Sequence, residues 1–234
     1  MIEATYIDHM GSDLSVVNAA RVSFGKTSEW EDQWDYECSL ENPRDYRDYS
    51  PTLKPKDERL INYLASHGHI SPFGHCFASF HVKAPIFVAR QLVKHKFLRW
   101  NEISRRYVDD EPEFYTPDVW RGRAEDVKQG SGAECKSQYF PSVYADEVNT
   151  KAVEDYRKML QQGVAPEQAR MILPQSTMTE WYWSGSLDAF ADMCRLRCDT
   201  DTQAETRLVA DDISKKMAEL FPVSWVALMG GETE

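Results

Sequence analysis

The sequence predicts a mixed α and β fold. Stretches whose apolar residues have helical spacing alternate along the chain with stretches whose side chains alternate between two faces. The strand-like stretches are rich in aromatic residues. Hydrophobic residues make up 42% of the 234 residues, which is ample for a sizeable core, so we expect one domain over residues 1–234. These patterns alone do not fix the strand order.

The first elements are read from caps and apolar spacing. Ser12 is a candidate cap for a short helix in "DLSVVNAARVSF". Residues 25–57 carry many charges, three prolines and little periodicity, so we expect an exposed excursion there. "ERLINYLAS" follows as a helix that Gly68 ends.

A strand and a helix are expected next. "HCFASFHVKAP" alternates between two faces and ends at Pro85, which indicates a strand. "IFVARQLVKHKF" is predicted to be a helix with Ile86, Ala89 and Val93 on one side.

The second half is expected to hold three helices and one strand. "YADEVNTKAVEDYRKMLQQG" reads as a helix ended by Gly163, and "APEQARMIL" as a shorter helix ended by Pro174. "TMTEWYW" alternates as a strand. Gly185 and Ser186 are expected to open the last helix. That helix places on one side Leu187, Phe190, Cys194 and Arg197.

One stretch differs in charge from the rest of the chain. The protein has 38 acidic residues against 27 Lys and Arg, a net charge of −11, which argues against a nucleic-acid or anionic-membrane partner. Residues 90–106 nevertheless contain Glu102 as their only acid. Their basic residues are Arg90, Lys94, Lys96, Arg99, Arg105 and Arg106. Such a local cluster suits a small, multiply charged anion in a pocket, although a solvated helical face would look the same.

The residues inside this stretch suggest a nucleotide. On a helix, Gln91, Lys94 and His95 would form one polar edge. "WNEIS" then places an amide, a carboxylate and a hydroxyl between two cationic groups, which suits phosphates together with a base. A nucleic-acid-binding module that uses residues 90–106 is the alternative.

Composition limits the remaining possibilities. No apolar run approaches the ~20 residues of a membrane helix, and the first residues lack a signal-peptide pattern, so we expect a cytoplasmic protein. The five cysteines include no Cys-x-x-Cys pair and are expected to be reduced thiols. His67, His69 and His75 leave a metal-dependent hydrolase as a third hypothesis, but their pattern is weak and we expect no metal site.

The basic stretch resembles the signature of the flavin-dependent thymidylate synthases, which is Arg-His-Arg, seven variable residues and Ser. In "KHKFLRWNEIS", His95 is central and seven residues separate Lys96 from Ser104; the "NE" before and the "RY" after Ser104 match as well. Lys94 and Lys96 replace the two arginines, which keeps the charge but loses the planar fork.

Further segments match this family in order along the chain. They are "DLSVVNAARVSF", "HGHISPFGHCFASFHVKAPIFVARQ", "FYTP", "ARMILP" and "LRCDTDTQAE". Residues 25–57 and 118–148 match weakly or not at all, so we transfer no roles to them.

The resemblance implies a fold and a reaction. The fold would be α+β, one domain with a central, mostly antiparallel sheet packed with helices. The enzyme would convert dUMP to dTMP by reductive methylation, with methylenetetrahydrofolate as the carbon donor and FAD reduced by NADPH as the hydride source. It would need no nucleophilic cysteine. It would be a homotetramer with active sites shared between subunits, and its partners would be small molecules, not nucleic acid or membrane.

The resemblance also implies roles for individual residues. Arg197, in "RLRCD", matches the catalytic arginine that favours the ionised N3 of uracil. The positions that match dUMP contacts are Gln91, Leu92, Val93, Lys94, Glu102, Ile103, Ser104, Arg105, Arg106, Arg170 and Arg197. The positions that match FAD contacts are Ser23, His69, Ser71, Lys94, His95, Lys96, Glu102, Ser186, Asp188 and Asp192. Ser186 and Asp188 depart from the family pattern, which has Asn and Arg there.

Two of these residues also have a purely structural interpretation. Arg197 could pair with Asp199 or Asp201 at the end of its helix. Ser104 could cap a helix.

Cysteine and tryptophan offer two further alternatives. Cys76 follows His75 and could form a Cys and His pair, although a buried strand cysteine is the simpler interpretation. Trp181 and Trp183 are expected to be core or subunit contacts, not a stacking platform.

Overall fold

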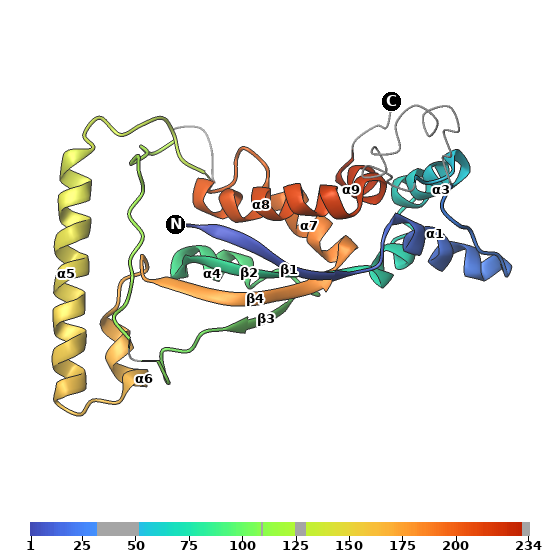
Figure 1. Cartoon of the computed structure of the whole chain (residues 1–234). Helices are drawn as coiled ribbons and strands as arrows, with labels where there is room; N and C mark the ends of the chain where they lie inside the picture. The colour runs from blue at the N-terminus through green and yellow to red at the C-terminus, as the bar shows by residue number, and fades with distance from the viewer. Residues whose placement is uncertain (32–51, 109, 125–129, 231–234) are drawn as a thin grey trace, which may run out of the picture.

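The centre of the protein is a four-stranded sheet of order β1-β2-β4-β3, in which every neighbouring pair is antiparallel (Figure 1). The computed structural model describes residues 1–31, 52–108, 110–124 and 130–230. The strands are β1 (Glu3–Met10), β2 (Phe77–Pro85), β3 (Arg99–Glu102) and β4 (Met178–Ser186). The predicted α+β class with an antiparallel sheet is therefore confirmed.

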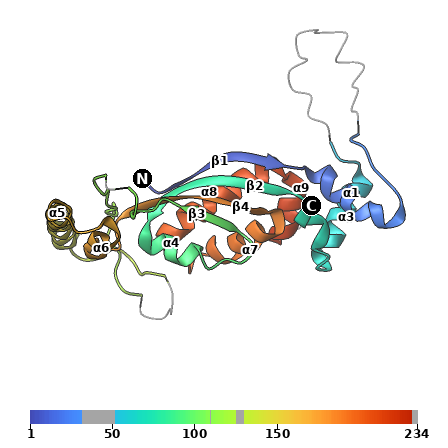
Figure 2. The same ribbon diagram turned by 90° about the horizontal axis from the view of Figure 1, so that it is seen from below.

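Helices lie on one face of the sheet and at both of its ends (Figures 1 and 2). They are α1 (Asp13–Arg21), α3 (Pro55–Ser66), α4 (Ile86–Leu92), α5 (Tyr139–Gln161), α6 (Pro166–Ala169), α7 (Leu187–Arg197), α8 (Ala204–Leu220) and α9 (Pro222–Met229). Helices α4, α7 and α8 pack against the sheet. Helices α1, α3 and α9 gather at one end, whereas α5 and α6 stand off the opposite end. None of the described helices is long and apolar enough to cross a membrane.

The core lies between the sheet and the helices that cover it. In β2 the alternate residues Ala78, Phe80 and Val82 are buried, as period-two spacing requires. Trp181 and Trp183 of β4 are 1% and 0% exposed, which confirms their prediction as core residues. Aromatic rings bury large areas, so this strand contributes heavily to the core.

The helix predicted over "IFVARQLVKHKF" is shorter than expected. Helix α4 ends at Leu92, and Val93 is 49% exposed instead of lying on the buried side. The chain turns there because it must reverse into β3, where Arg99 pairs with Ser184 of β4. The predicted helical edge of Gln91, Lys94 and His95 is therefore wrong: only Gln91 belongs to the helix.

Other boundaries moved by a few residues. Helix α1 does begin directly after Ser12, whose backbone N–H donates to Ser15 Oγ. Helix α5 starts earlier than predicted, at Tyr139. Gly185 belongs to β4 and does not open the next helix, because its backbone pairs with Ala78 of β2. Part of the predicted excursion, residues 32–51, lies outside the described residues.

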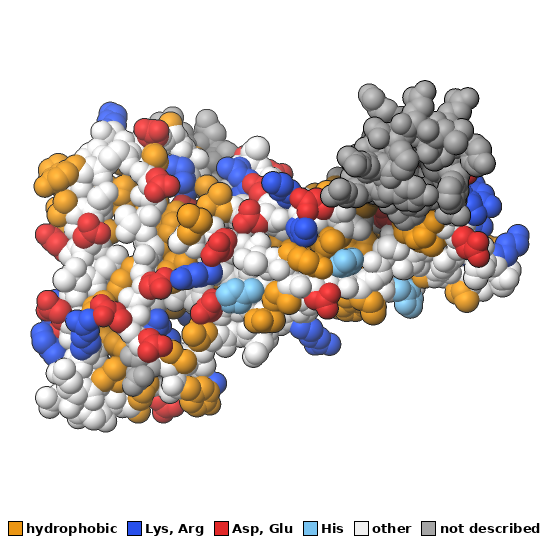
Figure 3. Space-filling view, in the orientation of Figure 1, with side chains coloured by type: hydrophobic (Ala, Val, Ile, Leu, Met, Phe, Trp, Pro, Cys, Tyr) orange, Lys and Arg blue, Asp and Glu red, His pale blue; other side chains and the backbone are white. Residues whose placement is uncertain are grey.

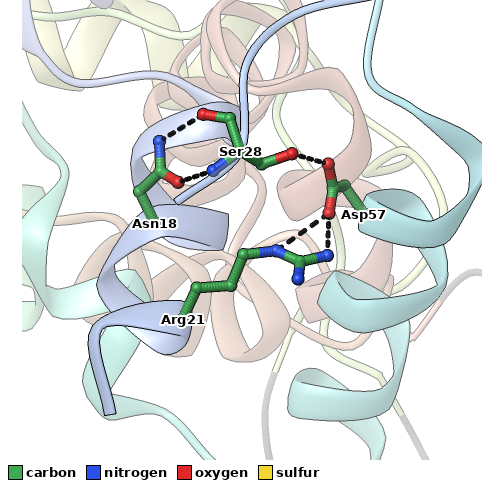
Figure 4. A network of polar contacts seen from close by, with 4 residues as sticks. All are labelled: Asn18, Arg21, Ser28 and Asp57. Carbon is green, nitrogen blue, oxygen red and sulfur yellow. Dashed lines mark hydrogen bonds and ion pairs between the residues drawn. The ribbon is translucent and has the colours of Figure 1, made fainter. Parts of the chain in front are cut away.

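A buried polar network joins α1 to α3 (Figure 4). The Asn18 amide both accepts from Ser28 N and donates to Ser28 O, at 2.7 and 3.1 Å. The Asp57 carboxylate is fully buried and accepts from Arg21 and from the Ser28 hydroxyl. Burial raises the pKa of Asp57, but the Ser28 hydroxyl and the Arg21 guanidinium outweigh it and hold that pKa below its usual value. The described ends of the predicted excursion are thus tied to the body of the protein.

Candidate functional site

The signature segment forms the turn between α4 and β3 and then β3 itself. Lys94 and Lys96 are exposed in this turn, whereas Leu98 is 9% exposed and packs on Gly185 of β4. A Cβ on Gly185 would overlap the Leu98 side chain, so only glycine allows the turn to approach the strand this closely. The turn is thereby fixed against the sheet.

Arg197 meets His95 at this turn. The Arg197 Nε–H donates to His95 Nε2 across 3.0 Å, from the last residue of α7 to the middle of the signature. Burial and the positive charge of Arg197 lower the pKa of His95 to about 4, so the ring is neutral near pH 7 and can accept this bond.

The structure does not show Arg197 paired with Asp199 or Asp201, the structural alternative for this residue. Within the described part of the chain Arg197 forms no ion pair, and Asp199 Oδ1 instead accepts the backbone N–H of Asp201. Burial lowers the pKa of Arg197, which nonetheless stays a cation at neutral pH. A half-buried guanidinium held by a neutral ring is available for an anionic ligand.

Gln91 lies next to this pair but is itself occupied. Its amide bonds to Gln203, and its Oε1 accepts from the Thr206 hydroxyl at 3.2 Å. Sequence reasoning missed Gln203 and Thr206; the match at "LRCDTDTQAE" was the one signal that pointed to their segment. Leu92 is fully buried, so a ligand could reach only its backbone.

Glu102 and the residues after it form a second group beside β4. Thr179 Oγ1 donates to Glu102 Oε1 at 2.7 Å, and Trp100 Nε1 donates to Glu102 Oε2 at 3.0 Å. Arg106 Nε donates to Ser104 Oγ at 3.1 Å. Ser104 starts a turn, since its carbonyl accepts from Tyr107 N and no helix follows within residues 105–108. The helix-cap alternative for Ser104 is therefore wrong.

Three further predicted dUMP contacts, Ile103, Arg105 and Arg170, lie toward the Met178 end of β4. Ile103 N donates to Glu180 O at 2.9 Å, and Arg105 donates to Asp110 O at 2.8 Å. Arg170 is exposed in the turn after α6, where its Nε donates to Glu167 O at 3.2 Å.

A third group contains predicted flavin contacts at the opposite end of β4. The 3₁₀ turn Ser71–His75 lies against the start of α7, where Leu187 N donates to Cys76 O at 2.8 Å. Asp188 Oδ1 is buried there without a hydrogen-bond partner. Ser23 is exposed in the 3₁₀ turn Val22–Phe24, next to α1.

The residues of this region fit a flavin nucleotide. Lys94 and Lys96 make no ion pair with any described residue, so both charges are free for phosphates. The unsatisfied Asp188 oxygen suits a ring N–H donor. His69 and Ser71 are exposed, and Ser186 is half-buried at the end of β4. Asp192 is the exception, because it is paired with Arg195.

One chain does not bring all the predicted residues together. Arg170 follows α6, beyond the Met178 end of β4, whereas Arg197 ends α7, which lies against the sheet toward the Ser186 end (Figures 1 and 2). The turn that carries Arg170 packs mainly on α5 and α6, whereas α7 packs on α8, α9 and the sheet.

The histidine and cysteine alternatives gain no support from the geometry. His67 stacks on Tyr63, and among the described residues no group of three or more His, Cys, Asp or Glu could hold a metal. The Cys76 thiol is buried, and burial raises its pKa to about 11, which suits a core residue and not a nucleophile. The four described cysteines are free, and Cys38 lies outside the described residues.

Comparisons with known proteins agree with this arrangement. The family model of the thymidylate synthase complementing protein matches residues 5–223. A flavin-dependent thymidylate synthase of Thermus thermophilus is 37% identical over 221 residues, 94% of this chain and 73% of that protein. One of Thermosipho africanus is 34% identical over 227 residues, 95% of this chain and 89% of that protein.

A solved structure agrees as well. The UMP/dUMP methylase PolB of Streptomyces cacaoi, bound with 5-Br UMP, has a TM-score of 0.79 at 28% identity and covers 98% of this chain and 94% of its own. The match thus extends over the sheet, the signature turn and the Arg197 helix. The chain belongs to the thymidylate synthase complementing protein family, the flavin-dependent thymidylate synthases, and is an enzyme of that family.

Proposed function

We propose that this enzyme converts dUMP to dTMP, with methylenetetrahydrofolate as carbon donor and FAD reduced by NADPH as hydride source. The observation that carries the proposal is a hydrogen bond. The Arg197 guanidinium donates to the neutral ring of His95, which is a residue of the family signature.

Arg197 is suited to activate the uracil ring. Its Nε is engaged by His95, which leaves the two terminal nitrogens to face a ligand in one orientation. Uracil must lose its N3 proton, or share it, before C5 becomes nucleophilic, and a nearby cation stabilises that negative charge. His95 fixes the direction of the guanidinium and adds no competing charge of its own.

Cations and hydrogen-bonding groups would hold the rest of dUMP. Arg106 and Arg170 are both exposed and suit the phosphate. Glu102 is fixed by Thr179 and Trp100, so it presents a carboxylate of defined orientation to a sugar or ring donor. Gln91, Val93 and Lys94 approach from the α4 side.

The flavin would be held by Lys94, Lys96 and the groups at the start of α7. When bound, FAD would supply the hydride for the methyl group. The protein's part is to orient the flavin, with Ser23, His69 and Ser71 at one side of it and Ser186 with Asp188 at the other. The unpaired lysines and the unsatisfied Asp188 oxygen support this placement.

We also propose a cytoplasmic, single-domain homotetramer whose active sites are shared between subunits. The separation of Arg170 from Arg197 in one chain supports shared sites. Phe140, Tyr144 and Val148 form an exposed stripe at every fourth residue of α5, 60%, 63% and 55% exposed. Figure 3 shows hydrophobic side chains on this outer edge among charged ones. Such a stripe suits a second copy of the chain.

A direct assay tests the reaction. Purified protein with dUMP, methylenetetrahydrofolate, NADPH and FAD should form dTMP and should stop when any one of them is withheld. Lys94→Arg should keep FAD and dUMP binding, whereas Lys94→Ala should weaken nucleotide affinity by about 1–3 kcal/mol. Lys215→Ala, exposed on α8, is the matched control. Absence of dTMP from a folded protein that binds no FAD would refute the proposal.

A further inference from the structure

Phe97 has an unusual backbone conformation for an aromatic residue. Its φ is 67°, and it is the one non-glycine residue with positive φ among the described residues. In this left-handed region the Cβ crowds the following carbonyl, so glycine or asparagine is usual and a bulky residue is an outlier. The conformation therefore costs free energy.

The Phe97 side chain adds little stability to offset this conformational cost. Its ring is 82% exposed, so it buries hardly any surface in the free chain. The strain is instead imposed by the neighbours: Leu98 is packed on Gly185, and the Phe97 carbonyl oxygen lies 3.2 Å from where a Gly185 Cβ would stand. A strained residue held by its surroundings, with its side chain projecting outward, is typical of ligand sites.

The charges around Phe97 indicate what the ring would meet. Lys94 and Lys96 are exposed in the same turn, and Arg99 is exposed at the start of β3; none of the three makes an ion pair with any described residue. An aromatic ring among free cations suits a planar heteroaromatic ring that carries phosphates. The turn also carries His95, through which it contacts Arg197.

We propose that Phe97 is a ligand-contacting residue whose ring stacks on the planar ring system of the flavin. This inference rests on the proposed function, because it takes FAD as the nucleotide bound by the lysines of the turn. The strained backbone at Phe97 then serves FAD binding and does not stabilise the fold.

The proposal predicts opposite effects on stability and on binding. In flavin-free, full-length protein, Phe97→Asn and Phe97→Gly should leave Tm unchanged or raise it by up to about 4 °C, because both residues tolerate positive φ. The same variants should weaken FAD binding by about 5- to 100-fold, because one stacking partner is lost. Phe97→Tyr should stay within about 2-fold of the wild type, because it keeps the ring. Leu208→Asn, exposed on α8, is the control that should leave FAD affinity unchanged.

A fluorescent variant locates the stacked ring. Flavin emission is strongly quenched by a tryptophan in contact, so FAD bound to Phe97→Trp should emit less than FAD bound to the wild type. Equal emission at saturating protein would overturn the assignment to the flavin ring.

Other outcomes would also overturn the proposal. A Tm drop of several degrees in Phe97→Asn and Phe97→Gly would make the ring part of the folded core. Loss of tetramer with unchanged FAD affinity would assign Phe97 to a contact between copies. A change confined to binding of a single-stranded oligonucleotide would assign it to a nucleobase. Failure of the wild type itself to bind FAD would refute the proposed function, whereas equal FAD binding by wild type and variants would refute this inference alone.

Discussion

Arg197 and His95 form a hydrogen-bonded pair of one cation and one neutral ring. A second cation beside Arg197 would repel it, but burial and that same repulsion lower the pKa of His95 to about 4. The ring therefore accepts a hydrogen bond at neutral pH, where an exposed histidine would already be partly charged. The guanidinium keeps its full charge and gains a fixed direction.

Removing the Arg197 guanidinium should slow methylation much more than flavin reduction. At saturating dUMP in single turnover, Arg197→Ala should lower the rate of dTMP formation per reduced flavin by about 100-fold or more, because the uracil anion loses its cation. Reduction of the flavin by NADPH needs no uracil anion and should change little. Lys215→Ala, which removes an exposed cation on α8, is the control. A variant that binds FAD and still forms dTMP at the wild-type rate would leave Arg197 with a structural role.

Acid should weaken the protein through His95. The folded pKa of about 4 lies below the ordinary value of 6.5, so the unfolded chain takes up this proton first. The stability that the neutral ring contributes is complete above pH 6.5 and is lost as the pH falls toward 4. The Tm of the wild type should therefore fall relative to that of His95→Asn across this range. A constant difference between the two Tm values would contradict the lowered pKa.

At the scale of elements, helices and strands with regular apolar spacing were predicted from the sequence. Strand pairing and contacts between elements were not. Helix α7 and strand β2 were found because apolar spacing within each is regular. Strand β3 was missed, since its four residues lie inside the basic stretch and become a strand only by pairing with β4. Strand β1 and the helices α8 and α9 were also not predicted. Contacts such as Gln91 with Gln203 join residues 112 apart, which no local pattern can reveal.

The candidate site shows the same limit. Residue types at 90–106 indicated a nucleotide, but the resemblance alone connected them with Arg197 and with Ser71. The strain at Phe97 had no sequence signal either, because it depends on how closely Leu98 approaches Gly185. Geometry that arises between elements had to come from the structure.

Breaking the network between α1 and α3 should destabilise the protein. Asp57→Ala removes a fully buried carboxylate and leaves the Arg21 guanidinium without its partner, at a cost of about 3 kcal/mol and a Tm fall of about 6–12 °C. Asp155→Ala breaks an exposed pair with Lys151 and should leave Tm close to that of the wild type. Because the pKa of Asp57 is lowered in the folded protein, the wild-type advantage should be complete above about pH 4 and should shrink as the pH falls further, first because the unfolded chain takes up the proton and finally because the folded carboxylate is protonated. Equal Tm values for the two variants at pH 7 would show that the network adds no stability.

At the scale of the whole molecule, elements that carry predicted site residues lie at both ends of the sheet. Helix α6 and Arg170 lie beyond one end of β4, and the predicted flavin contacts at the start of α7 lie at the other (Figure 1). The α5 helix packs on its own chain mainly through α6 and the turn that follows. A second copy that covers this helix could bring its Arg197 and signature turn to the first copy's Arg170.

Mixing two inactive chains tests this arrangement. Arg170→Ala and Arg197→Ala should each be nearly inactive alone, because every site lacks one arginine. If a site takes Arg170 from one chain and Arg197 from another, co-expressed mixtures contain sites with both arginines intact, and random pairing restores about a quarter of wild-type activity. The two chains would carry different tags, so that mixed oligomers can be isolated before dTMP formation is measured. The control is a mixture of the two separately purified variants, combined without subunit exchange. If both arginines of a site came from one chain, no mixed oligomer could contain an intact site, so activity that stays at the level of the single variants would refute shared sites.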